Sequence, residues 1–302
     1  MRIVKKSLLI QFVVFYILFT FFTYNEKTFA EEQDIPASNL LNKYTKLSKQ
    51  LYNNQFQRQL YLNSEESPHD LKGEIYAVVD YPFSTFNTSL NNPTHWCDAL
   101  ILNINIKYCH TDTNQGNDIL LLNIGKKFKQ PLSNTYRVEF KSRKIISTNN
   151  YYAAELDSSN GPLGTYAYHI FIEATPLKNG HTFMHFTYAY SFGLTGKLAM
   201  KTYIATIGRD KVGFTINGKL PDGNNQYIQG VRGIVERNTM RYYLAIDAYL
   251  AGLKLPAENQ LEWRLQQWYR STEQYAIQLH EVELIDYLDM KHSEYERQQI
   301  AQ

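Results

Sequence analysis

Two neighbouring segments decide the fold: Thr165–Thr175 (TYAYHIFIEAT) and His181–Phe192 (HTFMHFTYAYSF), separated by a loop that ends in Asn179-Gly180. Both are rich in aromatic and β-branched residues, and Asn-Gly is the dipeptide most typical of a tight hairpin between two strands. Four segments upstream show the same strand character. They are Asn103–His110, Asp118–Lys127, Tyr136–Ser147 and Tyr151–Asp157.

The segments on either side of these six strands set the order of elements. Glu74–Tyr81 (EIYAVVDY) predicts one more strand, which ends at a proline because proline cannot donate to a ladder. Phe83–Leu90 and Thr94–Ile101 predict two short helices. After the last strand, Gly193–Phe214 has apolar residues at helical spacing. We therefore predict an α+β fold: a seven-stranded curved antiparallel sheet that grips the long helix Gly193–Phe214 over a cavity.

This order resembles that of the START-like, or helix-grip, superfamily over residues 73–216. Two local phrases carry the resemblance: Asp80–Trp96 (DYPFSTFNTSLNNPTHW) and Met200–Lys211 (MKTYIATIGRDK). The resemblance implies a pocket between sheet and helix, in which members of the superfamily bind lipids, sterols, polyketides or aromatic hormones. Some members are cyclases or hydroxylase components, so the fold does not fix the chemistry. The full-length arrangement is similar to that of a group of exported bacterial proteins.

Helical segments flank the predicted helix-grip unit. Ser38–Leu62 reads as a helix, residues 63–68 as a polar linker, and Lys219–Gln226 as a polar loop before three more helical stretches. The added helices are expected to cover either the mouth of the pocket or the outer face of the sheet. The predicted division is a signal peptide (residues 1–30), an N-terminal helix with linker (31–72), the helix-grip domain (73–216) and a C-terminal helical extension (227–302).

The first thirty residues have the pattern of a secretory signal peptide. Arg2, Lys5 and Lys6 precede an apolar run from Ser7 to Phe22, and Thr28-Phe29-Ala30 offers small residues for cleavage. The run is shorter than the ~20 residues of a spanning helix. We predict an exported protein, periplasmic or secreted, with no stable membrane span after cleavage; an uncleaved N-terminal anchor is the alternative.

Charge and cysteine content narrow the partners. The chain has 31 basic and 29 acidic side chains, of which residues 1–30 hold four and one, so the remainder has a net charge of −1. This balance gives no reason to expect nucleic acid or an anionic membrane as partner. Cys97 and Cys109 predict a disulfide in an exported chain, with two buried free thiols as the alternative.

Aromatic residues are the main candidates for ligand contact. The chain holds 24 tyrosines, whose rings suit the wall of an amphipathic cavity. Arg209 could neutralise a ligand carboxylate, or it could cap the predicted helix together with Asp210 and Lys211. Each aromatic candidate is also a candidate for ordinary core. The aromatic candidates are Tyr76, Trp96, Tyr166, Tyr168, Tyr188, Tyr190 and Tyr203.

Two further clusters of polar residues have alternative interpretations. His181 and His185 share one face of a strand, and His169 lies on the preceding strand, which suggests either a metal site or three histidines facing outward. The outward-facing interpretation is favoured, so no metal site is predicted. A second set either docks one helix on another through charge pairs or binds an anionic head group. It comprises Arg232, Glu236, Arg237, Asn238, Arg241 and Asp247.

The sequence contains no strong catalytic signature. No second histidine follows His280-Glu281 at the spacing of a zinc protease, and no serine lies in a G-x-S-x-G context. We expect a non-enzymatic exported binding protein, without cofactor, that holds an apolar or amphipathic lipid-like molecule. The alternatives are an enzyme (cyclase, isomerase or hydrolase) that uses the same cavity, and an envelope interaction module that binds a protein partner through residues 230–298.

Overall fold

The computed structural model describes residues 35–113, 118–206 and 208–300, so the predicted signal peptide and its cleavage site lie outside the described residues. Within the described part, eight strands form one antiparallel sheet in the order β1-β2-β8-β7-β6-β5-β4-β3. The strands are β1 (Leu60–Glu66), β2 (Asp70–Val79), β3 (Ile106–Asp112), β4 (Asp118–Ile124), β5 (Tyr136–Ser147), β6 (Tyr152–Asn160), β7 (Thr165–Pro176) and β8 (Thr182–Phe192).

The edge strand β1 is the element that the sequence-based prediction missed. The N-terminal helix ends at residue 52 rather than at Leu62, and β1 occupies the end of the predicted helix and most of the predicted linker. The reason is a short alternation in which Leu60, Leu62 and Ser64 face the core and Leu62 pairs with Ile75 of β2. The sheet therefore has eight strands where seven were predicted.

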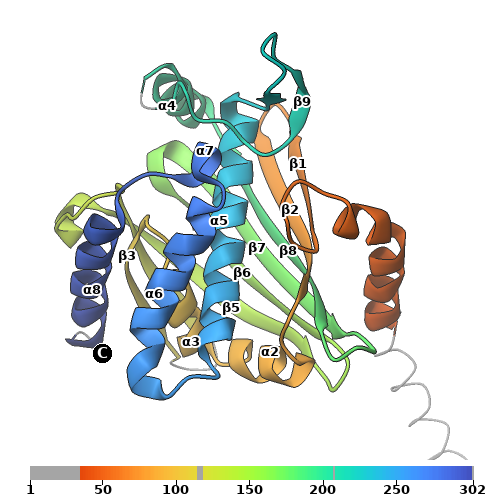
Figure 1. The fold of residues 1–302 in the computed structure, drawn as a ribbon. Helices are drawn as coiled ribbons and strands as arrows, with labels where there is room; N and C mark the ends of the chain where they lie inside the picture. Colours follow the sequence, from red (N-terminus) through yellow and green to blue (C-terminus); the bar gives the residue numbers. More distant parts are fainter. Residues whose placement is uncertain (1–34, 114–117, 207, 301–302) are drawn as a thin grey trace, which may run out of the picture.

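The helix that lies along the inner face of the sheet is α5 (Gly230–Gly252), as Figure 1 shows. The prediction that Gly193–Phe214 fills this place is wrong. That segment forms α4 (Leu194–Ala205), a helix of 12 residues at one end of the sheet with only Gly196 and Met200 buried. The outward positions Leu194 and Leu198 are 85% and 67% exposed. The helix on the inner face therefore comes from the segment that the sequence-based division assigns to the C-terminal extension (residues 227–302).

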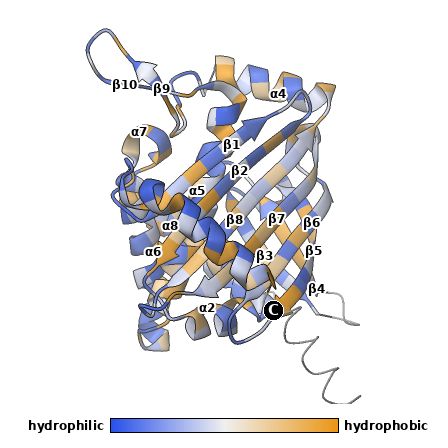
Figure 2. Ribbon diagram, turned by 90° about the vertical axis from the view of Figure 1, so that its right-hand side faces the viewer, coloured by the Kyte–Doolittle hydropathy of each residue, from blue (hydrophilic) through white to orange (hydrophobic). Residues whose placement is uncertain are grey.

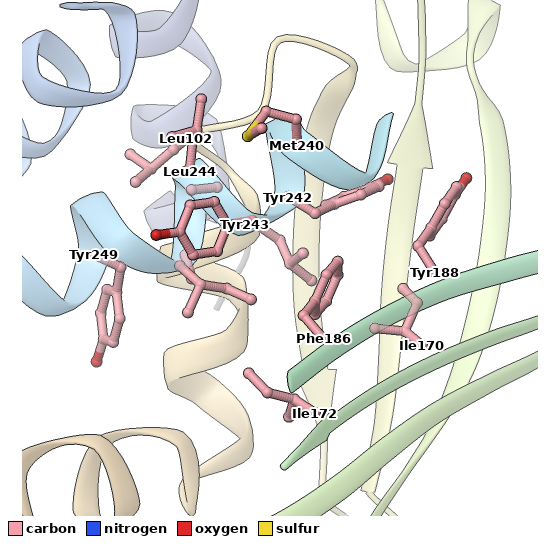
Figure 3. Close-up of a cluster of buried hydrophobic side chains, with 14 of the residues drawn as sticks. Leu102, Ile170, Ile172, Phe186, Tyr188, Met240, Tyr242, Tyr243, Leu244 and Tyr249 are labelled. Carbon is pink, nitrogen blue, oxygen red and sulfur yellow. The ribbon is translucent and has the colours of Figure 1, made fainter. Parts of the chain in front are cut away.

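The contact between α5 and the sheet is close because the strand offers a glycine at the crossing point. A Cβ on Gly73 of β2 would lie 2.1 Å from the Oγ1 atom of Thr239 in α5. Further along, the ring of Tyr242 packs on that of Tyr188 in β8, with centroids 5.2 Å apart. Figure 3 shows this pair beside Phe186 and Ile170, so the helix and the strands share one apolar layer.

Four more helices close the inner side. The two short helices of the prediction are confirmed as α2 (Phe83–Leu90) and α3 (Pro93–Leu100); the Asn92 side chain caps α3 by accepting from the Thr94 amide at 3.1 Å. α6 (Ala257–Glu273) packs on α5, and α8 (Leu284–Ile300) packs on β3. Residues of these helices belong to the same hydrophobic core as the sheet.

The remaining elements lie around this core. The N-terminal helix packs against the outer face, where Leu47 and Leu51 contact a second apolar cluster that includes Tyr76 and Phe183. The short helix α7 (Ala276–Leu279) precedes α8, and the hairpin of β9 (Ile216–Lys219) and β10 (Asn225–Tyr227) projects from the molecule (Figure 2). None of the helices in the described residues is both long and apolar enough to cross a membrane.

The predicted disulfide is confirmed. Cys97 of α3 and Cys109 of β3 are bonded, with their Cα atoms 5.2 Å apart. The alternative of two free thiols is therefore wrong. The bridge holds α3 against the edge strand of the sheet.

Candidate functional site

A cavity of about 270 Å³ lies between the inner face of the sheet and the helices α4 and α5. It lies where α5 leaves part of the inner face of the sheet uncovered and α4 forms the facing wall. The described residues that line it are Asn103, Asn105, Ile124, Lys127, Pro162, Leu163, Thr165, Tyr168, Tyr188, Tyr190, Gly196, Ala199, Met200, Tyr203, Ile234, Arg237, Asn238, Arg241 and Tyr242.

One wall of the cavity consists of tyrosines. Tyr168 of β7 and Tyr188 and Tyr190 of β8 face inward because alternate residues of a strand share a face. The rings of Tyr168 and Tyr190 stack with centroids 5.1 Å apart, and the hydroxyl of Tyr168 lies 2.8 Å from the Thr165 Oγ1 atom. Burial raises the pKa of Tyr168 and that of Tyr188, so both remain neutral hydrogen-bonding groups. This wall combines apolar ring faces with polar tips.

The opposite wall carries positive charge. Arg237 and Arg241 are one turn apart on α5, share a face of the helix, and are 2% and 3% exposed. Lys127, which follows β4, reaches the same cluster through Glu281: its Nζ atom lies 2.6 Å from the Glu281 Oε1 atom. Lys211 Nζ lies 3.3 Å from the other carboxylate oxygen of Glu281. We call these five residues the cavity cluster.

Charge is not balanced in the cavity cluster. Glu281 also accepts from Arg241, so one carboxylate serves three cations. Burial alone would raise the pKa of Glu281, but Arg241 and the lysines hold it below its ordinary value. Burial, together with Arg241, lowers the pKa of Lys127 to about 8. The fourth cation, Arg237, has no ion pair with a carboxylate among the described residues.

The hydrogen bonds of the two arginines are also incomplete. The NH1 group of Arg237 donates to the Val212 carbonyl oxygen at 3.3 Å, whereas its Nε atom is buried without a partner in the described structure. The Nε atom of Arg241 is also buried without a hydrogen-bond partner in the described structure. Burial and the neighbouring Arg241 lower the pKa of Arg237, but an arginine stays charged in proteins.

The lining therefore suits a ligand with an acceptor group and an apolar body. The residues that line the cavity include tyrosines, amides and cations but no Asp, Glu or His among those described. Such a set can donate hydrogen bonds and offer ring faces; it lacks the carboxylate or imidazole of an ordinary general base. The volume of about 270 Å³ lies just below the range of small-molecule sites, which span roughly 300–1,000 Å³.

Four of the eight predicted ligand contacts meet at this cavity: Tyr168, Tyr188, Tyr190 and Tyr203. The structure places the other four elsewhere. Tyr76 lies on the outer face against His185, Trp96 is buried in α3 with its indole N–H donating to the Leu90 carbonyl, Tyr166 is 42% exposed, and Arg209 is exposed outside the lining.

Sequence reasoning did not place Arg237, Arg241 and Lys127 at the cavity. The available signal was the spacing of Arg237 and Arg241, four residues apart on a tyrosine-rich segment. Of the two interpretations made for that segment, charge-paired docking has a counterpart in the structure, whereas recognition of an anion stays a prediction. Arg241 reaches Glu281 across 40 residues, whereas Arg237 faces the cavity.

The histidines do not converge. His185 is buried on the outer face between Glu173, 2.8 Å from its Nδ1 atom, and Glu74, 3.1 Å from its Nε2 atom. His169 pairs with Asp157 and His181 with Asp80. Glu155, Asp157 and His169 do bring three ligand-type atoms within 4.8 Å of one another, but Arg143 already pairs with Glu155.

A larger hollow of about 610 Å³ lies beside the β9–β10 hairpin. Its lining is mainly side-chain amides, among them Asn217, Asn224 and Gln229, and it includes no charged residue of the described chain. It lacks the combination of ring faces and buried charge that marks the cavity between sheet and α4. We therefore take the smaller cavity as the candidate site.

Comparison with known proteins gives no family assignment. No protein-family model and no curated protein matches the chain. Similar solved structures include Ara h 8.0201 (10% identity, TM-score 0.35, covering 64% of this chain and 98% of that one). They also include truncated norcoclaurine synthase from Thalictrum flavum (14%, 0.32, 48% and 89%) and human StAR-related lipid transfer protein 5 (7%, 0.29, 58% and 93%). At these TM-scores the likeness carries no argument, and the helix-grip description rests on the antiparallel sheet around α5.

Proposed function

We propose that the protein is an exported binding protein that holds an apolar or amphipathic small molecule in the cavity between the sheet and α4. The observation that carries the proposal is the cavity wall of tyrosines from β7 and β8, which offers ring faces next to polar tips. Burying the apolar surface of a ligand there would stabilise the complex by about 25 cal/mol per Å². The cavity is present without a bound ligand, as small-molecule sites usually are.

Export is part of the proposal and is supported by two features of the chain. The first is the signal-like pattern of residues 1–30. The second is the Cys97–Cys109 disulfide, since structural disulfides persist in oxidising compartments. Fractionation of cells that express the full chain tests this, and recovery of the protein only from the cytoplasm with the thiols reduced would overturn it.

Filling the cavity tests the binding function. Ala199 lines the cavity from α4, whereas Ala205 is an exposed residue of the same helix outside the lining. We expect Ala199→Trp to weaken binding of the neutral dye Nile red at least tenfold, and Ala205→Trp to leave it unchanged. Native mass spectrometry of the unmodified protein should show a bound small molecule. A protein that carries no ligand and binds no apolar dye would contradict the proposal.

Catalysis in the same cavity is the second candidate, and one observation favours it. The pKa of Lys127, lowered to about 8, leaves part of its amine neutral near neutral pH. The absence of Asp, Glu and His from the described lining counts against ordinary acid–base catalysis. If the co-purifying ligand is recovered unchanged after long incubation at pH 8, binding alone is supported. Conversion that is lost in Lys127→Met would instead establish an enzyme.

The third reading, a partner-binding module formed by residues 230–298, has no support from the comparisons. In addition, α5, α6 and α8 contribute to the main core, so their apolar faces are already used within the chain.

A further inference from the structure

We infer that the ligand is an amphipathic organic anion, and that Arg237 and Arg241 bind its oxyanion group while its apolar body lies on the tyrosine wall. This inference rests on the proposed function and adds the charge of the ligand to it. The feature that carries it is an excess of buried positive charge at one end of the cavity.

Arg237 is the buried cation of the cavity cluster that has no ion pair with a carboxylate among the described residues. Arg237 is 2% exposed and lines the cavity; its NH1 group donates to the Val212 carbonyl at 3.3 Å, and its other side-chain partner is the neutral Tyr203. A guanidinium carries five N–H donors and does not lose its charge. A buried charge without a paired anion is costly, so proteins normally pair it or use it to bind an anion.

The one carboxylate of the cavity cluster makes its ion pairs with the other three cations, although its charge also acts on Arg237. Glu281 is the carboxylate of the cluster, and its Oε1 atom already accepts from Arg241 and Lys127 while Oε2 faces Lys211. These contacts explain why the segment that carries Glu281 docks on α5, but they leave four cations with one carboxylate. The neighbouring carboxylate on α5, Glu236, points elsewhere: it accepts from Ser64 and from the backbone amides of residues 214 and 215.

The geometry fits an oxyanion better than a neutral acceptor. Arg237 and Arg241 lie one turn apart on the same face of α5, and the buried Nε atom of each lacks a hydrogen-bond partner in the described structure. A guanidinium group favours planar carboxylates and related oxyanions, because two of its parallel N–H donors meet two oxygens. Across the cavity, Tyr168 and Tyr190 present stacked rings that suit an apolar body.

Two dyes that share one aromatic body test the inference. 8-Anilinonaphthalene-1-sulfonate is N-phenyl-1-naphthylamine with an added sulfonate, so the two probes separate the anionic group from the apolar body. In fluorescence titrations we expect the sulfonate to bind the unmodified protein at least tenfold more tightly than the neutral dye. Decanoate should displace it, whereas decanol should compete much less.

Variants assign this preference to the site. Arg237→Met should weaken sulfonate binding at least tenfold and leave binding of the neutral dye within about twofold. Arg209→Met is the matched control, because Arg209 is exposed and outside the lining, and it should change neither affinity. Equal affinity for the two dyes in the unmodified protein, or an equal loss of both in Arg237→Met, would overturn the inference and leave the proposed function standing. If neither dye binds, the proposed function falls first and the inference with it.

Discussion

Two clusters of buried positive charge in the described residues differ in how their charge is compensated. In what we call the α8 anchor, Lys107 of β3 and Lys291 of α8 share Glu294, with Nζ–O distances of 3.0 and 2.6 Å. In the cavity cluster, Glu281 serves Arg241 and two lysines, and Arg237 remains without a carboxylate. Cations outnumber carboxylates in both, although only the second set borders the cavity.

The chemistry of the cations explains the difference. Lys291 donates to the carbonyls of Asn103 and Ile106 at 3.1 and 2.7 Å, and burial lowers its pKa to about 8, so it can lose its excess proton. Arginine has no such route, because it stays protonated at any pH at which the protein folds. The excess charge of a buried lysine can be removed by deprotonation within the protein. An arginine keeps its charge, so an arginine beside a cavity is neutralised only by an added anion.

The largest expected effect concerns the carboxylate of the α8 anchor. Glu294→Gln leaves two buried lysines without a counter-charge, which should lower the free energy of unfolding by about 3–5 kcal/mol. Urea unfolding measures it. The control is Asp289→Asn, which removes a surface pair with Lys129 whose side chains are 70% and 59% exposed and should change stability by less than ~1 kcal/mol. A loss below ~1 kcal/mol in Glu294→Gln would mean that the two lysines of the α8 anchor do not depend on Glu294 as their counter-charge.

The pH dependence of stability tests whether the pKa of the buried Lys291 is lowered. The pKa of Lys291 is about 8 in the folded protein and 10.5 ordinarily, so between these values the unfolded chain binds more protons. Stability contributed through this group therefore rises with pH, by on the order of 2 kcal/mol between pH 8 and pH 10. The measurement is the difference in unfolding free energy between the unmodified protein and Lys291→Met across that range. A difference that stays constant would contradict the lowered pKa.

The smallest effect is expected at Arg237, and its sign is opposite to that at Glu294. Without ligand, Arg237→Met removes an unpaired buried charge and should raise the unfolding free energy by about 1 kcal/mol. Arg58 provides the contrast, because it pairs with Asp247 at 2.8 Å; Arg58→Met should lower stability by roughly 2 kcal/mol. Thermal unfolding without added ligand separates the two. A large loss of stability in Arg237→Met would show that Arg237 has a structural partner.

Local sequence features predicted the strands, the two short helices and the disulfide, because each depends on neighbouring residues or on one short separation. β1 escaped because its alternation covers only Leu60, Leu62 and Ser64 before two glutamates, and it directly follows a helical pattern. The helix that lies on the inner face of the sheet was predicted wrongly for another reason. α4 and α5 both show helical periodicity, and the choice between them is made by long-range packing such as that of Thr239 on Gly73.

The tyrosine wall of the candidate site could be predicted from the sequence, whereas the charged wall could not. Alternation along β7 and β8 sufficed to group Tyr168, Tyr188 and Tyr190 on one face, since strand periodicity fixes direction. The charged wall depends on contacts that no local pattern encodes, among them that of Arg241 with Glu281 and that of Lys127 with the same carboxylate, 154 residues farther along the chain.

The position of α5 in the chain sets the order in which this protein can fold. All eight strands of the sheet are present once Phe192 has been synthesised, but the helix that covers their inner face ends only at Gly252. Until then Ile170, Ile172 and Phe186 lie on an inner face of the sheet that no helix covers. In addition, the pairing of β2 with β8 joins parts of the chain that are far apart in sequence. Exposed apolar sheets of high contact order fold slowly and aggregate readily. A chain that stops short of α5 is therefore expected to need a chaperone, because its sheet lacks the helix that covers the inner face.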